Sequence, residues 1–186
     1  MTSFKYMGEF KDESSLPTRV QKGAVMFKEP DAEKFAIIAN ILSVVLLVLF
    51  LLLTFFYAGR HYNTWGAVVA FLLLVPHEFL HAIWMKGKVY MYTNWKKMML
   101  FVTSTEDITK GRFIWMSLFP TLCFGFVPFV GFIINPDWIF LGYLGAFSIA
   151  MGAGDYCNIF LALTQMPKGS VTFLSGIHSY WYLPEK

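Results

Sequence analysis

Charged residues are scarce in this chain, and long stretches lack them altogether. Asp, Glu, Lys and Arg make up 15% of the 186 residues, whereas hydrophobic residues make up 56%. Soluble globular domains carry about 25% charged residues, so this composition excludes an ordinary water-soluble protein. Lys and Arg form no continuous basic stripe, and a net charge of +3 gives no indication of a nucleic-acid partner.

Cysteine is almost lacking too, and so is any sign of a cleaved leader. The two cysteines, Cys123 and Cys157, lie in apolar stretches, which predicts apolar core residues rather than a disulfide framework. The first 34 residues mix both charge signs before any apolar run, unlike a signal peptide. We therefore expect the first apolar stretch to remain as a membrane anchor.

The apolar residues are concentrated in four long stretches. A hydrocarbon core about 30 Å thick needs about 20 apolar helical residues, and residues about 35–57, 65–85, 113–134 and 138–166 meet that length. Asp31, after Pro30, is a plausible N-cap for the first helix. We predict an α-helical integral membrane protein with four transmembrane helices. The acids and histidines inside these stretches are His77, Glu78, His81 and Asp155.

Basic residues are unevenly divided among the connecting segments. All of the 15 except Arg60 lie in the N-terminal segment, in the segment after the second stretch, or in the C-terminal tail. Short loops rich in Lys and Arg stay in the cytoplasm. We therefore predict a multi-pass protein of the cell membrane with the N-terminus and the C-terminus cytoplasmic.

Outside the four stretches, some segments favour extended structure. Val89–Thr103 is rich in β-branched and aromatic residues and predicts a β-hairpin within about 87–106, with its turn at Asn94–Lys97. Thr18–Phe27 has some strand character, and the tail, 167–186, looks extended over Val171–Leu183. We divide the chain into a cytoplasmic N-terminal segment, 1–34, and a four-helix membrane domain, 35–186, with the hairpin and tail at the cytoplasmic surface.

The second apolar stretch contains a motif with its own chemistry, because Val75–Trp84 reads VPHEFLHAIW. His77 and His81 are four residues apart, so on a helix their rings lie about 40° apart on one face. With Glu78 this is the HExxH arrangement of two zinc ligands and a general base. An ionisable group at membrane depth costs about 3 kcal/mol, which favours a shared function such as metal binding. A polar cluster that only joins helices is the alternative.

A catalytic zinc site needs a third protein ligand and an open fourth position. Asp155 is the remaining acid within the four stretches, and we predict that its carboxylate faces the two histidine rings. Asn158, one turn further, is a candidate for orienting a substrate carbonyl, although a structural hydrogen bond fits it equally well. Asp155 itself has a structural alternative, as a carboxylate that joins helices. A stripe of small residues favours close approach of the fourth helix: Gly142, Ala146, Ala150 and Gly154.

Prolines interrupt helical hydrogen bonding in two of the stretches. They are Pro76, beside the motif, and Pro120 and Pro128 in the third stretch. Each is interpreted either as a tolerated kink or as a break beside a cavity.

These motifs resemble known families. An HExxH in one transmembrane helix with an aspartate on a later one is similar to the site-2 proteases, which are intramembrane zinc metalloproteases. The four-span layout resembles more specifically a zincin peptidase family of small bacterial integral membrane proteins. That family shares the Gly-x-x-Asp segment and a tail like Tyr180–Pro184, and the resemblance covers most of Gly66–Glu185. It implies that His77, His81 and Asp155 bind zinc and that Glu78 is the base. Tyr156 departs from the glycine that usually follows the aspartate in site-2 proteases.

The leading hypothesis is an intramembrane zinc metalloprotease with Zn²⁺ as cofactor. A zinc-activated water would attack a peptide bond of a membrane protein or peptide substrate, with Glu78 as general base. The hairpin is a candidate for holding the substrate as an added strand. The alternative is a non-enzymatic membrane protein whose metal or polar cluster holds its helices together while it binds or regulates a partner, and a fourth protein ligand would favour it. A metal-ion carrier would need polar residues along the outer halves of the helices, which offer none. The lipid bilayer is an expected partner, and the oligomeric state is not predicted.

Overall fold

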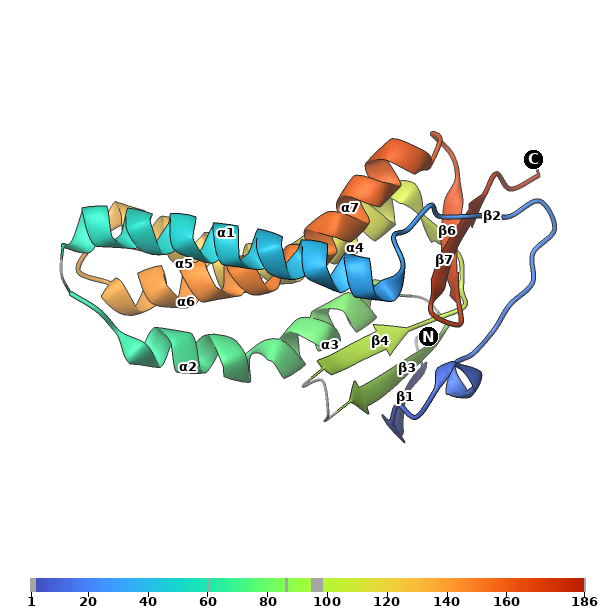
Figure 1. Cartoon of the computed structure of the whole chain (residues 1–186), viewed down its shortest axis with the longest axis horizontal. Helices are drawn as coiled ribbons and strands as arrows, with labels where there is room; N and C mark the ends of the chain where they lie inside the picture. Colours follow the sequence, from blue (N-terminus) through green and yellow to red (C-terminus); the bar gives the residue numbers. More distant parts are fainter. Residues whose placement is uncertain (1–2, 60, 86, 95–98, 186) are drawn as a thin grey trace. The chain divides into compact units, whose positions relative to one another are not determined.

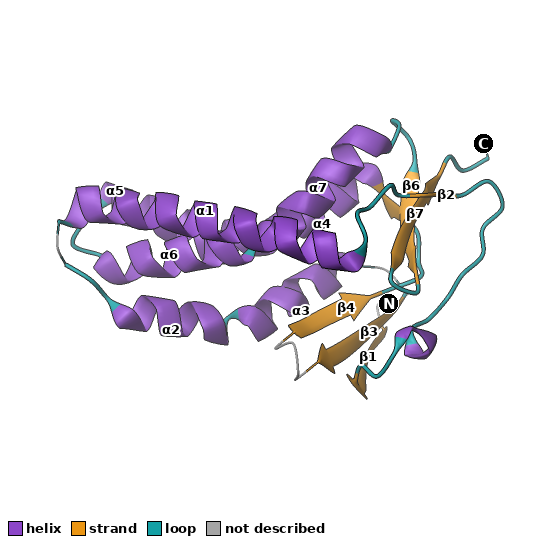
Figure 2. Cartoon of the chain, viewed as in Figure 1, coloured by secondary structure: helices purple, strands orange, loops and turns teal. Residues whose placement is uncertain are grey.

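The structure is a computed structural model that describes residues 3–59, 61–85, 87–94 and 99–185 (Figure 1). Helices account for 57% of it. It divides into two compact units: a helical unit of residues 30–77 and 117–158, and a sheet unit of residues 1–29, 78–116 and 159–186. All described strands belong to the sheet unit (Figure 2). The division predicted between residues 34 and 35 stays a prediction.

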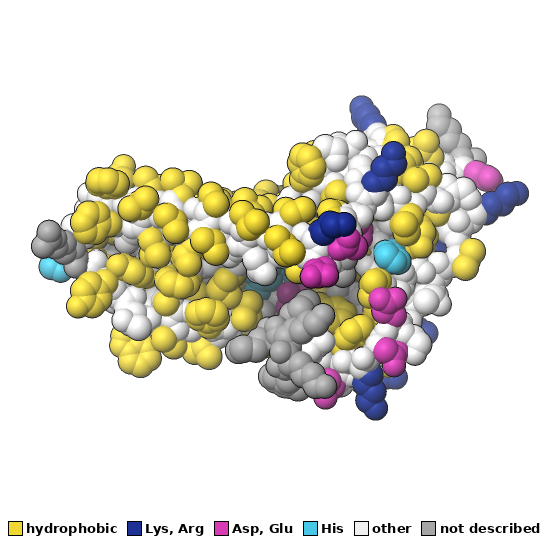
Figure 3. All heavy atoms as spheres, viewed as in Figure 1, with side chains coloured by type: hydrophobic (Ala, Val, Ile, Leu, Met, Phe, Trp, Pro, Cys, Tyr) yellow, Lys and Arg dark blue, Asp and Glu magenta, His cyan; other side chains and the backbone are white. Residues whose placement is uncertain are grey.

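The first helix, α1 (Ala32–Ala58), begins at the predicted cap. The Asp31 carboxylate accepts a hydrogen bond from the Lys34 N–H at 2.9 Å, which satisfies one of the unpaired donors of the first turn. None of the most apolar window of α1 is buried, and hydrophobic side chains cover its visible face (Figure 3). The exposed side chains include Ile37, Ile41, Val44, Val48, Leu52 and Phe56. A helix that is apolar all round and exposed suits contact with lipid.

Two further predicted spans are bent pairs of helices. α2 (Thr64–Leu72) and α3 (Leu74–Trp84) meet at 43°, and α6 (Ile139–Met151) and α7 (Ala153–Gln165) meet at 49°. Two helical stretches, 33–58 and 110–134, are each long and apolar enough to cross a membrane, and the bent pairs raise that number to four. The chain is therefore compatible with membrane insertion, while its topology stays a prediction.

Both bends have local causes that composition does not reveal. Pro76 has no N–H to donate to the Leu72 carbonyl, and the His77 N–H bonds the Leu73 carbonyl at 2.8 Å. At the second bend, a Cβ on Gly152 would lie 2.3 Å from Thr121 Oγ1, so glycine is needed there. The second bend falls three residues before Asp155, which therefore lies in the first turn of a new helix.

The third predicted span is continuous but not regular. It consists of α4 (Lys110–Thr121), a π-helical segment η3 (Leu122–Phe126) and α5 (Val127–Ile134). Pro120 lies inside α4, and Pro128 lies in the first turn of α5. Because Pro128 cannot donate to the carbonyl of Phe124, the π-helical segment occupies the place where regular bonding is interrupted.

Within the helical unit, α6 packs against α1, α2 and α5 (Figure 1). Gly66 lets α2 approach at backbone distance, since a Cβ there would lie 2.7 Å from the Phe140 carbonyl oxygen. Of the predicted small-residue stripe, Gly142 contacts the ring of Phe132, but a Cβ on Gly154 would meet nothing within 4 Å. The predicted close approach is therefore wrong at Gly154, because the bend at Gly152 ends the stripe. The core of this unit consists of Phe129, Phe132, Ala146 and Ile149.

The sheet unit contains two small sheets. The first has the order β1-β3-β4, with β1 (Ser3–Glu9), β3 (Lys88–Asn94) and β4 (Met99–Thr103). β3 and β4 are antiparallel, which confirms the predicted hairpin. Its predicted turn, apart from Asn94, lies outside the described residues. β1 pairs in parallel with β3, and the sequence analysis missed it because parallel partners lie far apart in the chain.

The second sheet has the order β2-β7-β6-β5. It consists of β2 (Val25–Met26), β7 (His178–Tyr182), β6 (Val171–Ser175) and β5 (Ile108–Thr109). β6 and β7 form a hairpin around Gly176, whose φ of 62° favours glycine, so the extended tail is confirmed. The strand expected within Thr18–Phe27 is reduced to β2, and a short 3₁₀ helix, η1 (Glu13–Ser15), precedes it.

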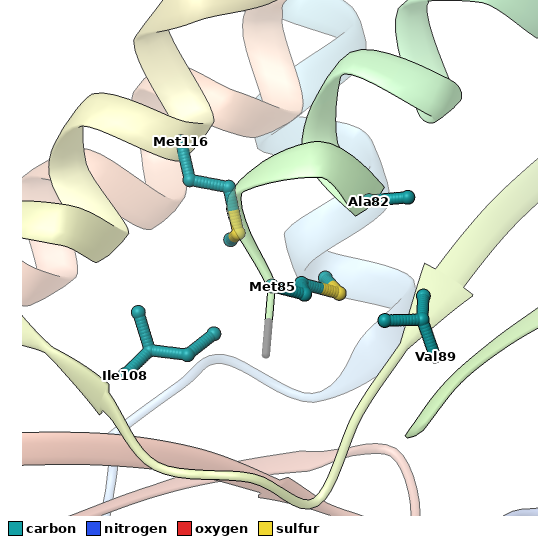
Figure 4. Close-up of a cluster of buried hydrophobic side chains, with 5 residues drawn as sticks. All are labelled: Ala82, Met85, Val89, Ile108 and Met116. Carbon is teal, nitrogen blue, oxygen red and sulfur yellow. The ribbon is translucent and has the colours of Figure 1, made fainter. Parts of the chain in front are cut away.

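A cluster of buried side chains joins helices to strands inside the sheet unit (Figure 4). It combines Ala82 and Met85 at the end of α3, Val89 of β3, Ile108 of β5 and Met116 of α4. This apolar contact holds the C-terminal half of α3 against α4.

Candidate metal centre

The motif residues His77, Glu78 and His81 form a compact group on α3. One ligand atom from each lies within 4.8 Å of those of the other two. In the described part of the chain, this is the one group of three or more His, Cys, Asp and Glu side chains with that spacing. His81 is buried, at 7% exposure, and Glu78 is half-buried. The group is able to hold a metal ion, as the helical spacing predicted.

His81 is oriented by a backbone carbonyl. Its Nδ1 lies 2.9 Å from the carbonyl oxygen of Met116 on α4. Because a carbonyl oxygen only accepts, Nδ1 carries the proton and the lone pair is on Nε2. Histidines that bind metals usually donate their other N–H in this way. The sequence analysis did not identify Met116, since the contact uses its backbone and no side-chain pattern signals it.

His77 meets the acid predicted from the fourth apolar stretch. Its Nε2 lies 3.1 Å from Oδ2 of Asp155, and the two side chains are 13% and 14% exposed. Two ligands about 2.0–2.1 Å from one tetrahedral zinc ion lie about 3.3 Å apart, so the two atoms have the spacing of neighbouring zinc ligands. Asp155 is not a member of the three-residue group on α3, and the contact that the structure describes for it is with His77.

The other predicted residues of the fourth stretch lie further along α7. Asn158 follows Asp155 by about one turn and is half-buried, and its role towards a substrate stays a prediction. Cys157 and Cys123 are both free thiols and half-buried, rather than the fully enclosed core residues expected.

A small cavity lies beside His77 within the helical unit. It leaves about 10 Å³ for the centre of a water molecule, close to the least that one water needs. Its lining includes the hydroxyl-bearing Ser148, whose Oγ is buried without a hydrogen-bond partner among the described residues. The full lining is Ala70, Leu73, Leu74, His77, Phe124, Ser148 and Met151.

The cavity coincides with the irregular points of the helical unit. Leu73 lies at the first bend, Phe124 in the π-helical segment, and Met151 next to the second bend. Interrupted helices within a membrane are tolerated where they are buried in protein or line a watery space. Of the two interpretations of the prolines, the cavity favours breaks beside a polar site for Pro76.

The first turn of α4 caps the ends of both helices that carry the motif residues. Arg112 Nε donates to the carbonyl of Trp84 at the end of α3. Lys110 Nζ donates to the carbonyls of Leu163, at 3.3 Å, and Met166, at 2.5 Å, at the end of α7. Positive side chains stabilise helix C-termini, where carbonyls lack partners. These basic residues, counted above only for topology, therefore also anchor α3 and α7.

The donor set fits zinc. Two imidazoles and one carboxylate are ligands of catalytic zinc sites, and the His81 proton position leaves its Nε2 lone pair in the form that binds metal. Glu78 is near enough to the ring nitrogens to contact a water held between them. The same distance also suits a fourth ligand, so geometry by itself leaves both roles open to Glu78.

Comparison with known proteins agrees with this chemistry. Residues 70–171, more than half of the chain, match a protein family described as "Putative zincin peptidase". The matched segment contains His77, Glu78, His81 and Asp155. No curated protein and no solved structure matched the chain. The chain belongs to this zincin peptidase family.

Proposed function

We propose that this protein is a zinc-dependent peptidase that hydrolyses peptide bonds of membrane-associated substrates within the bilayer. The observation that carries the proposal is the contact between His77 and Asp155 at 3.1 Å. It joins the motif helix to an acid 78 residues away, and both side chains are almost buried in apolar surroundings. An acid at such a site is costly unless it is paired or binds a metal.

Each residue has a defined part in the proposed reaction. His77, His81 and Asp155 hold zinc, which when bound activates a water and polarises the scissile carbonyl. Glu78 takes the proton from the attacking water and delivers it to the leaving amine. The Met116 carbonyl holds the proton on Nδ1 of His81 throughout. The cavity beside Ser148 offers a polar space for water next to His77.

The first sheet offers an edge for an extended substrate. Phe79 of α3 contacts Phe4 of β1, with ring centroids 5.1 Å apart, and Phe79 points about 160° away from His81 around the helix. β1 is thus associated with the side of α3 opposite the metal ligands, and the order β1-β3-β4 leaves β4 as the outer strand on the other side. No described strand pairs with the outer edge of β4. We infer that an unwound substrate pairs with this edge by main-chain hydrogen bonds.

The rival function is a membrane protein with a closed, structural metal site that binds or regulates a partner. It requires a fourth protein ligand, and Glu78 is the side chain near enough to supply it. The two functions therefore differ in what Glu78 does. As a general base Glu78 is dispensable for zinc binding, whereas as a fourth ligand it is required.

The test uses the full-length protein and its Glu78→Gln variant. Zinc content is measured on both after purification in detergent, and new N-termini of membrane proteins are mapped in cells that express each one. We expect equal zinc, near one per chain, and cleavage products only with the wild type. Loss of zinc in Glu78→Gln supports the structural rival, and equal zinc without any difference in cleavage products refutes the peptidase.

A further inference from the structure

The carbonyl that orients His81 lies at an unusual place in its helix. Met116 is inside α4, where a carbonyl normally accepts the N–H of the residue four positions later. That residue is Pro120, which has no N–H. The helical partner of the Met116 carbonyl is thus missing for a reason written in the sequence, although α4 continues through Pro120 to Thr121.

A buried carbonyl without a partner is unfavourable unless another donor replaces the missing one. His81 Nδ1 fills that role at 2.9 Å, and both His81 and Met116 are buried, at 7% and 5% exposure. Water therefore competes poorly for this bond. Packing of Met116 against Ala82, one residue after His81, holds the two helices at the required distance.

We propose that Pro120 is a positioning residue for the metal centre: by removing one backbone N–H, it reserves the Met116 carbonyl for His81. The bond places the proton on Nδ1 and fixes the direction of the ring. Nε2 then keeps its lone pair for the metal. The functional importance of this device rests on the proposed zinc peptidase, but the hydrogen bond itself does not.

An N–H at position 120 would act on the bond directly. It would draw the Met116 carbonyl along the axis of α4 and share its lone pairs, so that the bond to His81 lengthens and the ring gains freedom. Alanine also suits a helix interior better than proline does. The same substitution should therefore stabilise α4 while it weakens the orientation of His81, and these opposite signs distinguish positioning from packing.

The chain provides a matched control in the same apolar segment. Pro128 stands four residues after Phe124, so Pro128→Ala makes the same chemical change at a carbonyl other than that of Met116. Both variants keep every predicted ligand. Zinc affinity is measured on full-length protein in detergent by competition with a chromophoric chelator, and the unfolding midpoint is measured on metal-free protein.

We expect Pro120→Ala to weaken zinc binding about 10- to 100-fold, as loss of an outer partner of a ligating histidine does. Its metal-free unfolding midpoint should be unchanged or higher, and Pro128→Ala should bind zinc within about threefold of the wild type. Unchanged zinc affinity in Pro120→Ala overturns the proposal, and so does a loss of affinity that is accompanied by a lower metal-free midpoint.

A second measurement is independent of zinc and of activity. Nitrogen-15 NMR of histidine-labelled, metal-free protein reports which ring nitrogen of His81 carries the proton, and His81→Gln identifies its signals. We expect the proton on Nδ1 in the wild type and a mixture of tautomers in Pro120→Ala. A wild-type proton on Nε2 overturns the inference. If the wild type binds no zinc, the proposed function fails, and this measurement still decides the role of Pro120.

Discussion

Replacing Asp155 with asparagine separates a metal ligand from a carboxylate that only joins helices. The amide has nearly the same volume and is able to keep a hydrogen bond with Nε2 of His77, now 3.1 Å from Oδ2. It lacks the negative charge and is a poor zinc ligand. The structure therefore predicts a small effect on packing, and a large effect on zinc only if Asp155 coordinates the ion.

The magnitudes of the two outcomes are well separated. Because the two side chains are only 13% and 14% exposed, solvent screens their interaction weakly. An outer partner of a ligating histidine contributes about 10- to 100-fold in affinity, whereas a direct ligand should exceed that range. We expect a loss of more than about 100-fold, or about 2.7 kcal/mol. A neutral hydrogen bond by itself contributes about 1 kcal/mol, or about fivefold.

The assay is chelator competition on full-length protein, with the metal-free unfolding midpoint as a check on folding. Asn158→Ala is the matched control, since Asn158 lies about one turn further along α7 and should leave zinc affinity within about threefold. A loss of less than about tenfold in Asp155→Asn, with the fold intact, would refute Asp155 as the third ligand.

Three other predictions follow from packing, charge and topology. Gly66→Val should lower the unfolding midpoint in detergent by about 1–3 kcal/mol or more, because its Cβ would lie 2.7 Å from the Phe140 carbonyl oxygen, while Gly154→Ala, with nothing within 4 Å, should not; equal midpoints would contradict the close approach of α2 and α6. Burial raises the pKa of Glu29 above its ordinary value of 4.5, against the lowering effect of its hydrogen bond with Ser179. Stability present below pH 4.5 is therefore lost as pH rises through the raised value, so Glu29→Gln should unfold at a higher temperature than the wild type at pH 7 but not at pH 4, and a variant without this gain would exclude a buried, charged Glu29. Reporter fusions at both termini should read as cytoplasmic, as the distribution of basic residues predicts, and an external signal at either end would reverse the proposed orientation.

The sequence alone determined the features that depend on local spacing and on composition. The four apolar stretches, the Asp31 cap, the hairpin around Val89–Thr103 and the pairing of His77 with His81 on one face all follow from residues close together in the chain. Such features arise from helical periodicity, side-chain shape and hydropathy, which act over a few residues. For the same reason the HExxH motif was readable before any fold was known.

The tertiary structure decided how distant segments meet. The bends at Leu73 and Gly152, the parallel pairing of β1 with β3 and the contact of Asp155 with His77 depend on which neighbours pack against each segment. The orientation of His81 belongs to both levels. Pro120 is visible in the sequence, but its absent N–H gained meaning only when packing brought the ring of His81 within 2.9 Å of the Met116 carbonyl. A backbone group has no identity in the sequence, so only the fold reveals which side chain it contacts.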